Sequence, residues 1–312
     1  MFCVIPASSR NPGSPIFSLI TDFARIAFAP ARFAKANARR AKRAEMTMNN
    51  MDLSVIIVNY KSRKKTADCV RSVRSADLVG FRYEIILVDN ASGDGSGEAL
   101  AKEFLDLKCL ASDRNLGMGG GNNLGANAAT GEFLLILNPD TLLRTDSIRL
   151  MLEFLKNRTD VSLVGPKLIY PDGKLQYSCL HFPSLLMPFY RRTFIGRLAK
   201  KQLDKFMMLD YDHDSTKEVD WLMGSCMLIR RDLFVKLKGF DERFFMYFED
   251  TDLCRRVWHS GQKVVYLPQA VVIHDHSRGS AQNPWYLAPF TNKLSRAHIA
   301  SWIKYSLKWK FN

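Results

Sequence analysis

The stretch Phe133-Leu-Leu-Ile-Leu-Asn-Pro-Asp140 decides the fold of this chain. Its first five residues are all apolar, which is typical of a short strand buried inside a sheet. Asn138 and Asp140 follow directly, at the point where such a strand ends. In open α/β sheets, ligands bind outside the carboxyl ends of the strands. The stretch therefore predicts a buried central strand with a binding site at its end.

Outward from this strand, short apolar runs alternate with helical patterns. Strands are predicted at Leu53–Val58 and Tyr83–Val88, and helices at Arg63–Asp77, Asp94–Phe104, Gly120–Ala129 and Thr145–Lys156. This alternation predicts an α/β fold with a Rossmann-like, mostly parallel central sheet flanked by helices. Beyond residue 160 the alternation weakens, and we expect the charged stretch Arg191–Asp214 to be mobile.

Charge is unevenly placed along the 312 residues, which carry a net charge of +14. Residues 1–50 hold eight Lys or Arg and two acids, and residues 281–312 hold five Lys or Arg and no acid. We predict three parts: a basic arm at 1–50 that is disordered or precedes the native start, a main domain at 51–280, and a basic amphipathic helix at 281–312. Basic tails favour anionic surfaces, either nucleic acid or membrane phospholipid. The tails carry no nucleic-acid recognition motif, so we expect no nucleic-acid partner.

The cysteines and the apolar runs indicate where the protein works. None of the six cysteines forms a CxxC pair, so we interpret them as reduced residues of a cytoplasmic protein. No apolar run reaches the ~18–20 residues that span a bilayer. In the tail, Ile299, Trp302, Ile303 and Leu307 recur at helical spacing, and Trp302, Tyr305 and Trp309 suit the headgroup layer. This pattern predicts peripheral contact with an anionic membrane, and a helix docked on the main domain is the alternative.

Polar residues follow three of the predicted strands: Asn59-Tyr60, Asp89-Asn90 and Asn138-Pro-Asp140. Asp89 can accept a hydrogen bond from a base imide or a ribose hydroxyl, or it can cap a turn. The glycine-rich stretch Asn115–Gly125 lets backbone N–H groups approach an anion. It lacks the third glycine of the G-x-G-x-x-G dinucleotide fingerprint, because Asn122 stands there. A flexible turn is the alternative interpretation.

Carboxylates mark the second part of the predicted site. Asp140 is a hard oxygen ligand suited to Mg²⁺ or Mn²⁺ on a diphosphate, although it can also cap a helix. Glu249 and Asp250 open a helical pattern among aromatic residues, where a partly desolvated carboxylate is a better base. An acidic cluster favoured by the helix dipole is the alternative. The imidazole of His274 can complete a metal site with Asp140, or it can be structural.

Taken in order, these motifs resemble glycosyltransferase family 2, and within it the bacterial rhamnosyltransferase-like members. The matching stretches cover about residues 52–280 and include Val55-Ile-Ile-Val-Asn-Tyr60, Leu87-Val-Asp-Asn-Ala-Ser92, Leu137-Asn-Pro-Asp-Thr141, Trp221-Leu-Met-Gly224 and Tyr247-Phe-Glu-Asp-Thr-Asp-Leu-Cys254. The resemblance implies a GT-A fold, in which a nucleotide-binding half is fused to an acceptor-binding half, and inversion at the anomeric carbon. One position departs from many members of the family, because Asn138 replaces the first carboxylate of the metal motif.

The resemblance also assigns roles to residues. It implies that Asp250 is the general base and that Asp140 and His274 hold the metal. The implied donor-binding residues are Asn59, Tyr60, Asp89, Asn90, Asn115, Gly117, Asn122, Asn123 and Asn138. The implied acceptor-side residues are Trp221, Gly224 and Glu249.

The combined prediction is an inverting transferase of cell-surface polysaccharide synthesis. It moves a sugar, with L-rhamnose from dTDP-rhamnose as our choice, to a glycan or lipid-linked glycan at the inner face of the cell membrane. The alternatives are a transferase that uses another nucleotide sugar, such as a UDP-hexose, and a catalytically silent protein that binds glycans or nucleotides.

Overall fold

The computed structural model describes residues 51–192, 194–275 and 292–310. They belong to one compact unit, Met51–Asn312, and residues 1–50 form a separate unit. The predicted basic arm at 1–50 and the start of the predicted tail at 281–291 lie outside the described residues.

Four parallel strands form the first part of the sheet, in the order β3-β2-β1-β4. They are β1 (Leu53–Asn59), β2 (Tyr83–Asp89), β3 (Lys108–Ala111) and β4 (Phe133–Leu137). Three helices connect them: α2 (Arg63–Arg74), α3 (Ser96–Glu103) and α4 (Gly117–Asn127). The predicted α/β architecture is confirmed, and β4 has the predicted bounds. The sequence analysis missed β3, because this edge strand of Lys-Cys-Leu-Ala is mostly exposed and has no apolar run.

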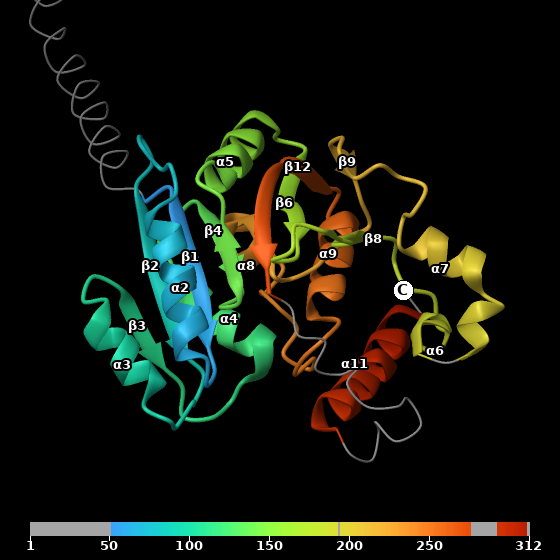
Figure 1. The fold of residues 1–312 in the computed structure, drawn as a ribbon, viewed down its shortest axis with the longest axis horizontal. Helices are drawn as coiled ribbons and strands as arrows, with labels where there is room; N and C mark the ends of the chain where they lie inside the picture. The colour runs from blue at the N-terminus through green and yellow to red at the C-terminus, as the bar shows by residue number, and fades with distance from the viewer. Residues whose placement is uncertain (1–50, 193, 276–291, 311–312) are drawn as a thin grey trace, which may run out of the picture. The chain divides into compact units, whose positions relative to one another are not determined.

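The second part of the sheet is mixed. Its main strands are β5 (Thr141–Leu143), β6 (Val161–Ile169), β11 (Cys226–Arg230) and β12 (Lys263–His274). β11 runs antiparallel between β4 and β6, and β12 runs parallel to β6. In Figure 1, β2, β1 and β4 follow one another across the first part of the sheet, and β6 and β12 lie beyond β4. Short strands lie around it: β7 (Leu175–Gln176), β8 (Cys179–Leu180), β9 (Lys217–Glu218) and β10 (Trp221–Leu222).

The remaining described helices lie between residues 147 and 310. They are α5 (Ser147–Asn157), α6 (Met187–Arg192), η1 (Phe194–Arg197), α7 (Lys200–Phe206), α8 (Arg231–Lys236), α9 (Glu249–His259) and α11 (Lys293–Lys310). Mobility at Arg191–Asp214 stays a prediction, but the structure places the helix α7 within this stretch, where none was predicted. Phe206 is buried in the apolar core and Leu203 packs against it, so two apolar side chains anchor a mostly charged segment.

Alternate residues of β1 face the two layers of the core. Leu53, Val55 and Ile57 pack in one apolar cluster with residues of α2, α3 and α5. Ile56 and Val58 pack in the other cluster with residues of α4, α8 and α9. A strand that is covered on both faces needs apolar residues at every position, which explains the continuous apolar run of β1.

Helix α4 begins at Gly117, three residues before its predicted start, and most of the glycine-rich stretch therefore lies inside it. A Cβ at Gly125 would lie 2.5 Å from Cγ2 of Ile56, so no other residue lets α4 approach β1 this closely. The inner glycines of this stretch therefore serve the packing of a helix on the sheet. The alternative interpretation as a flexible turn is wrong for them.

Helix α11 packs on the main domain along one face. Tyr305 is buried, and Nε1 of Trp309 donates to Oδ1 of Asp252 at 2.9 Å. The ammonium group of Lys308 lies 2.8 Å from Asp241 and 2.5 Å from Asp252. The expected headgroup position is therefore wrong for Tyr305, whose side chain is buried, and Trp309 is partly buried and hydrogen-bonded to the protein. Ile303 and Leu307 point outward and are 46% and 61% exposed.

Candidate active site

The carboxyl ends of the parallel strands meet at one edge of the sheet. Asn59 at the end of β1 stands opposite Asp89 at the end of β2, and Ile57 stands opposite Leu137 of β4. The register carries the predicted strand-end residues to one place. The chain returns to the same edge before β11, where the N–H of Asn138 donates to the carbonyl of Ser225 at 2.9 Å.

Asn59 is fully buried and holds the first strand end together. Its Nδ2 lies 2.8 Å from Oδ1 of Asp89, 3.1 Å from Oγ of Ser92 and 2.9 Å from Oγ of Ser96. Its Oδ1 accepts a hydrogen bond from the hydroxyl of Thr66. The structure thus brings Asn59 and Asp89 together, with Asn59 as a brace. Tyr60 beside them is 45% exposed and Asp89 is half-buried, so these two can meet a ligand.

Asn90 and Asn115 brace the entrance to α4. Nδ2 of the buried Asn90 lies 3.2 Å from Oδ1 of Asn115 and donates to the carbonyl of Gly117 at 3.0 Å. The N–H groups of Leu116 and Gly117 donate to the side-chain oxygens of Asn90 and Asn115. The two predicted donor-binding residues therefore fix the backbone where α4 begins.

Asn123 and Gly117 connect α4 to residues 239–248, which we call the bridging loop, whereas Asn122 is bonded within α4. The side chain of Asn123 donates to the carbonyl of Phe240 at 2.9 Å and accepts from its N–H at 2.8 Å. Gly117 has φ +75°, and a Cβ there would lie 2.0 Å from the carbonyl oxygen of Phe245, so the position requires glycine. The buried Asn122 donates to the carbonyl of Met118 one turn before it.

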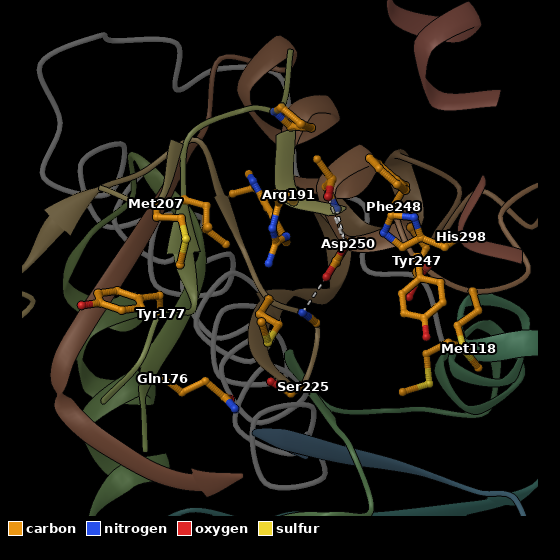
Figure 2. A pocket seen from close by; sticks show the side chains of 18 of the residues that line it. Met118, Gln176, Tyr177, Arg191, Met207, Ser225, Tyr247, Phe248, Asp250 and His298 are labelled. Carbon is orange, nitrogen blue, oxygen red and sulfur yellow. Dashed lines mark hydrogen bonds between the residues drawn. The ribbon is translucent and has the colours of Figure 1, made fainter. Parts of the chain in front are cut away.

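A cavity of about 680 Å³ lies beside this edge, and six of the predicted site residues line it. They are Asn138, Trp221, Gly224, Glu249, Asp250 and His274. Figure 2 shows Tyr247, Phe248 and His298 on one side of the cavity and Tyr177 and Met207 on the other, with Asp250 between them. The donor-binding residues from Asn59 to Asn123 are not part of this lining, and Met118 is the lining residue of α4.

Asp250 stands in the first turn of α9, and backbone and hydroxyl groups fix its carboxylate. The N–H of Gly224 donates to Oδ2 at 2.9 Å, and the N–H and hydroxyl of Thr251 donate to Oδ1 at 2.6 and 3.2 Å. A Cβ at Gly224 would lie only 3.1 Å from Cβ of Asp250. Burial raises the pKa of Asp250, and the three donors oppose this shift without cancelling it. A fixed carboxylate with a raised pKa has the properties of a general base.

At least four polar atoms in the cavity wall are buried and have no hydrogen-bond partner in the described part of the chain. They include Oδ1 of Asn138, Nε2 of Gln176, Oγ of Ser225 and Oε2 of Glu249. Burial first, and the neighbouring Asp250 second, raise the pKa of Glu249 well above its usual range. Unsatisfied buried groups are rare in native proteins, so their gathering in one cavity indicates a ligand site.

Asp140 and His274 face each other at the edge of the cavity, with 3.4 Å between Oδ1 and Nε2. Nδ1 of His274 lies 2.6 Å from Oε1 of the buried Gln176, and because an amide oxygen only accepts, Nδ1 is the donor of this hydrogen bond. Burial alone would raise the pKa of Asp140, but His274 and Lys65 lower it.

This pair fits part of a metal site. The described residues contain no cluster of three His, Cys, Asp or Glu side chains that could hold a metal ion. Asp140 and His274 therefore suit a cation that takes its other ligands from a diphosphate and from water, as Mg²⁺ does in nucleotide sites.

Sequence reasoning missed several lining residues that come from distant segments. Gln176 orients His274, Arg191 reaches in from α6, and the rings of Tyr247 and His298 are tilted by 58° with their centroids 5.0 Å apart. Of these residues, only Tyr247 could have been found from the sequence, because Tyr247 and Phe248 directly precede the acidic pair Glu249-Asp250.

The sheet edge with its polar strand ends lies beside a cavity that contains a fixed carboxylate. This combination is typical of an enzyme that transfers a chemical group. The profile described as glycosyl transferase family 2 matches residues 54–237, so the chain belongs to this family and is a glycosyltransferase. A profile described as the N-terminal domain of galactosyltransferase matches residues 209–277.

Two relatives are named rhamnosyltransferases. The N-acetylglucosaminyl-diphospho-decaprenol L-rhamnosyltransferase of Mycobacterium tuberculosis is 29% identical over 249 residues, which are 72% of this chain and 78% of the relative. The rhamnosyltransferase WbbL of Escherichia coli is 29% identical over 199 residues, 59% of this chain and 72% of the relative.

Solved structures support the GT-A type of fold. The mannosyltransferase PcManGT of Pyrobaculum calidifontis, in complex with GDP-Man and Mn²⁺, has a TM-score of 0.55 at 18% identity, covering 91% of this chain and 74% of that one. GalNAc-T7 with UDP, GalNAc and Mn²⁺ also has a TM-score of 0.55, at 17% identity, covering 72% of this chain and 44% of that one. None of the described helices is long and apolar enough to cross a membrane.

Proposed function

We propose that this glycosyltransferase moves L-rhamnose from dTDP-rhamnose to a glycan or lipid-linked glycan in cell-surface polysaccharide synthesis. The two rhamnosyltransferases from Mycobacterium tuberculosis and Escherichia coli support the choice of sugar. The name of the first relative, which specifies an acceptor linked through a diphosphate to decaprenol, supports the choice of acceptor class.

Asp250 carries the chemistry in this proposal. The proposed transfer depends on one observation: the carboxylate of Asp250 is fixed in the cavity wall, 2.9 Å from the backbone nitrogen of Gly224. Asp250 takes the proton of the acceptor hydroxyl, and the hydroxyl oxygen forms a bond to the anomeric carbon. The bond from that carbon to the nucleotide diphosphate breaks, the electron pair leaves with the diphosphate, and the configuration inverts. A positioned base of this kind contributes about 10²–10⁴ in rate.

The donor is held along the sheet edge. Asp89 and Tyr60, which are partly exposed at the ends of β2 and β1, contact the nucleoside. Asn138 and the first turn of α4 face the diphosphate, where the positive end of the helix dipole favours an anion. Asp140 and His274 hold Mg²⁺ or Mn²⁺, which neutralises charge on the leaving diphosphate when it is bound.

The acceptor enters from the opposite side of the cavity. Trp221 and Gly224 line its floor, and Tyr247 and His298 form a wall of ring faces. Aromatic faces are large apolar surfaces on which the C–H face of a sugar ring can pack. The polar groups of Glu249 and Asp250 lie beside this wall and face the sugar hydroxyls.

A nucleotide-release assay with a panel of donors tests the proposal. Wild-type protein is mixed with dTDP-rhamnose, UDP-GlcNAc, a UDP-hexose or GDP-mannose, each with a polyprenyl-diphosphate-linked GlcNAc acceptor. We expect acceptor-dependent release from dTDP-rhamnose above all. Faster release from a UDP or GDP sugar would replace rhamnose by that sugar, and acceptor-dependent release from none of them would contradict the proposed reaction.

We further propose that the protein works at the inner face of the cell membrane and contacts it through the outward flank of α11. Ile303 and Leu307 on this flank are largely exposed, while the opposite flank is packed on the protein. Liposome flotation should show binding to anionic vesicles that is lost in an Ile303→Ser, Leu307→Ser double variant. Equal binding by the variant and the wild type would rule this contact out.

A further inference from the structure

Glu249 is the first residue of α9, and its carboxyl group forms part of the cavity wall next to Asp250. The side chain is 8% exposed, and its Oε2 has no hydrogen-bond partner among the described residues. The stem of this side chain lies near the first turn of α4, where a Cβ added at Gly119 would meet Cβ of Glu249 at 3.7 Å. A held side chain with an unpaired buried oxygen at a cavity is suited to a partner that the protein itself does not supply.

The three acids of this helix turn differ in what they contact. Asp252 is paired with Arg256 and Lys308, and Asp250 accepts three hydrogen bonds. Glu249 has neither a cation nor an outside donor in the described part of the chain. A buried carboxylate without compensation is unfavourable, so the group that gives up its charge in this turn is Glu249.

We propose that Glu249 acts as a neutral carboxylic acid that donates a hydrogen bond from Oε2 to a hydroxyl oxygen of the bound sugar, while Asp250 remains the charged base. This inference rests on the proposed glycosyl transfer, because it needs a sugar in the cavity. It adds a second carboxyl group to the reaction. This group acts as a hydrogen-bond donor and keeps its proton, whereas Asp250 takes up a proton.

The arrangement has a chemical reason. Two neighbouring carboxylates cannot both be charged in a buried site at low cost, and a neutral partner leaves one negative charge on Asp250. Arg191 of α6, His274 of β12 and His298 of α11 also line the cavity, and none of them forms an ion pair with Glu249. A protonated carboxylic acid that works as a donor is an established device of enzymes.

Two variants distinguish a neutral donor from a charged group and from a side chain that only fills space. Gln keeps the shape and a donor but cannot be charged, whereas Met keeps the volume and has no donor. We expect Glu249→Gln to keep kcat/KM within about threefold of the wild type and Glu249→Met to lose about 10- to 100-fold, as for one buried hydrogen bond. A Gln variant as impaired as the Met variant would show that a charge is needed. A Met variant as active as the wild type would show that the side chain only packs.

An infrared measurement without substrate tests the protonation directly. The difference spectrum between wild type and Glu249→Gln at neutral pH should contain the C=O band of a protonated, buried carboxyl group. A spectrum without this band overturns the inference, whatever the kinetics show. Because the band does not depend on the donor sugar or the acceptor, its absence tells against Glu249 alone, and failure of the donor panel tells against the proposed function.

Discussion

At the carboxyl ends of β1 and β2, polar side chains are hydrogen-bonded to one another, whereas around the cavity several polar atoms have no partner in the described part of the chain. Asn59 reaches Asp89 and two serines, and Asn90 reaches Asn115. By contrast, Asn138 and Glu249 each present an unpaired buried oxygen to the cavity. The polar side chains at the strand ends, which we call the frame, therefore satisfy one another's hydrogen bonds. The cavity wall instead has unpaired polar atoms that a ligand can satisfy.

This difference predicts two kinds of mutational effect. A residue of the frame contributes to folding, because its loss leaves buried partners unsatisfied. A residue of the cavity wall contributes to binding or chemistry and is less needed by the fold, since unsatisfied groups at functional sites lower stability.

Asp250→Asn tests the cavity side of the comparison and should have the largest effect. The amide cannot take a proton, so we expect turnover to fall by about 10²–10⁴ while donor affinity stays unchanged. Nucleotide-release kinetics measure the first quantity, and calorimetry with the nucleoside diphosphate measures the second. Near-wild-type turnover in a folded variant would remove Asp250 from the role of base.

The pH profile sharpens the same test. The base must be ionised to act, and burial raises the pKa of Asp250. As the pH falls through this raised pKa, kcat/KM of the wild type should fall, beginning above the ordinary aspartate value of about 3.9. The residual activity of Asp250→Asn should lack this acid limb.

Asp140→Ala tests the proposed metal and diphosphate contact. Loss of one of two protein ligands should weaken the donor affinity by about 10- to 100-fold and remove its dependence on Mg²⁺ or Mn²⁺. Asp275→Ala is the matched control, because this neighbouring carboxylate is 63% exposed and pairs with Lys65. Calorimetry with and without the cation decides, and an unchanged, cation-dependent affinity in Asp140→Ala contradicts the assignment.

Asn59→Ala tests the frame. Several buried groups lose their partner, so we expect a loss of about 2 kcal/mol in the free energy of unfolding, measured with urea. Asn157→Ala at the exposed end of α5 is the control and should change this free energy by less than about 0.5 kcal/mol. An Asn59→Ala variant that is as stable as the wild type but binds no donor would make Asn59 a ligand contact rather than a brace.

Removal of residues 1–50 should have the smallest effect. The composition changes at Met51, where the resemblance to the family begins, so we expect the same unfolding midpoint and the same nucleotide release. A shortened protein that is insoluble or inactive would assign these residues to the working enzyme.

The first region was far more predictable from the sequence than the second. Val55-Ile-Ile-Val58 and Phe133–Leu137 are continuous apolar runs, and each strand ends at the last residue of its run or one residue beyond it. The polar residues that follow come together because parallel strands share one register.

The cavity was predictable only in part, because its walls come from segments far apart in the sequence. Asp250 was found through its position in an acidic helix start, but Gln176 and Arg191 lie on elements too short to leave a periodic pattern. The sequence also left open whether α11 docks on the protein, because an amphipathic helix shows the same spacing of apolar residues on a membrane and on a protein.

The bridging loop joins the two regions, and from this connection we expect the binding of the two substrates to be coupled. Its Phe245 carbonyl accepts from the N–H of Met118 at 3.0 Å, Asn123 holds its Phe240, and its far end leads into the helix of Asp250. A nucleotide that orders the start of α4 should therefore raise the affinity for the acceptor, and the acceptor should raise the affinity for the nucleotide by the same factor. Acceptor titrations with and without nucleoside diphosphate measure this factor. We expect it to shrink in Asn123→Ala, and a factor of one in the wild type would mean that the two halves bind independently.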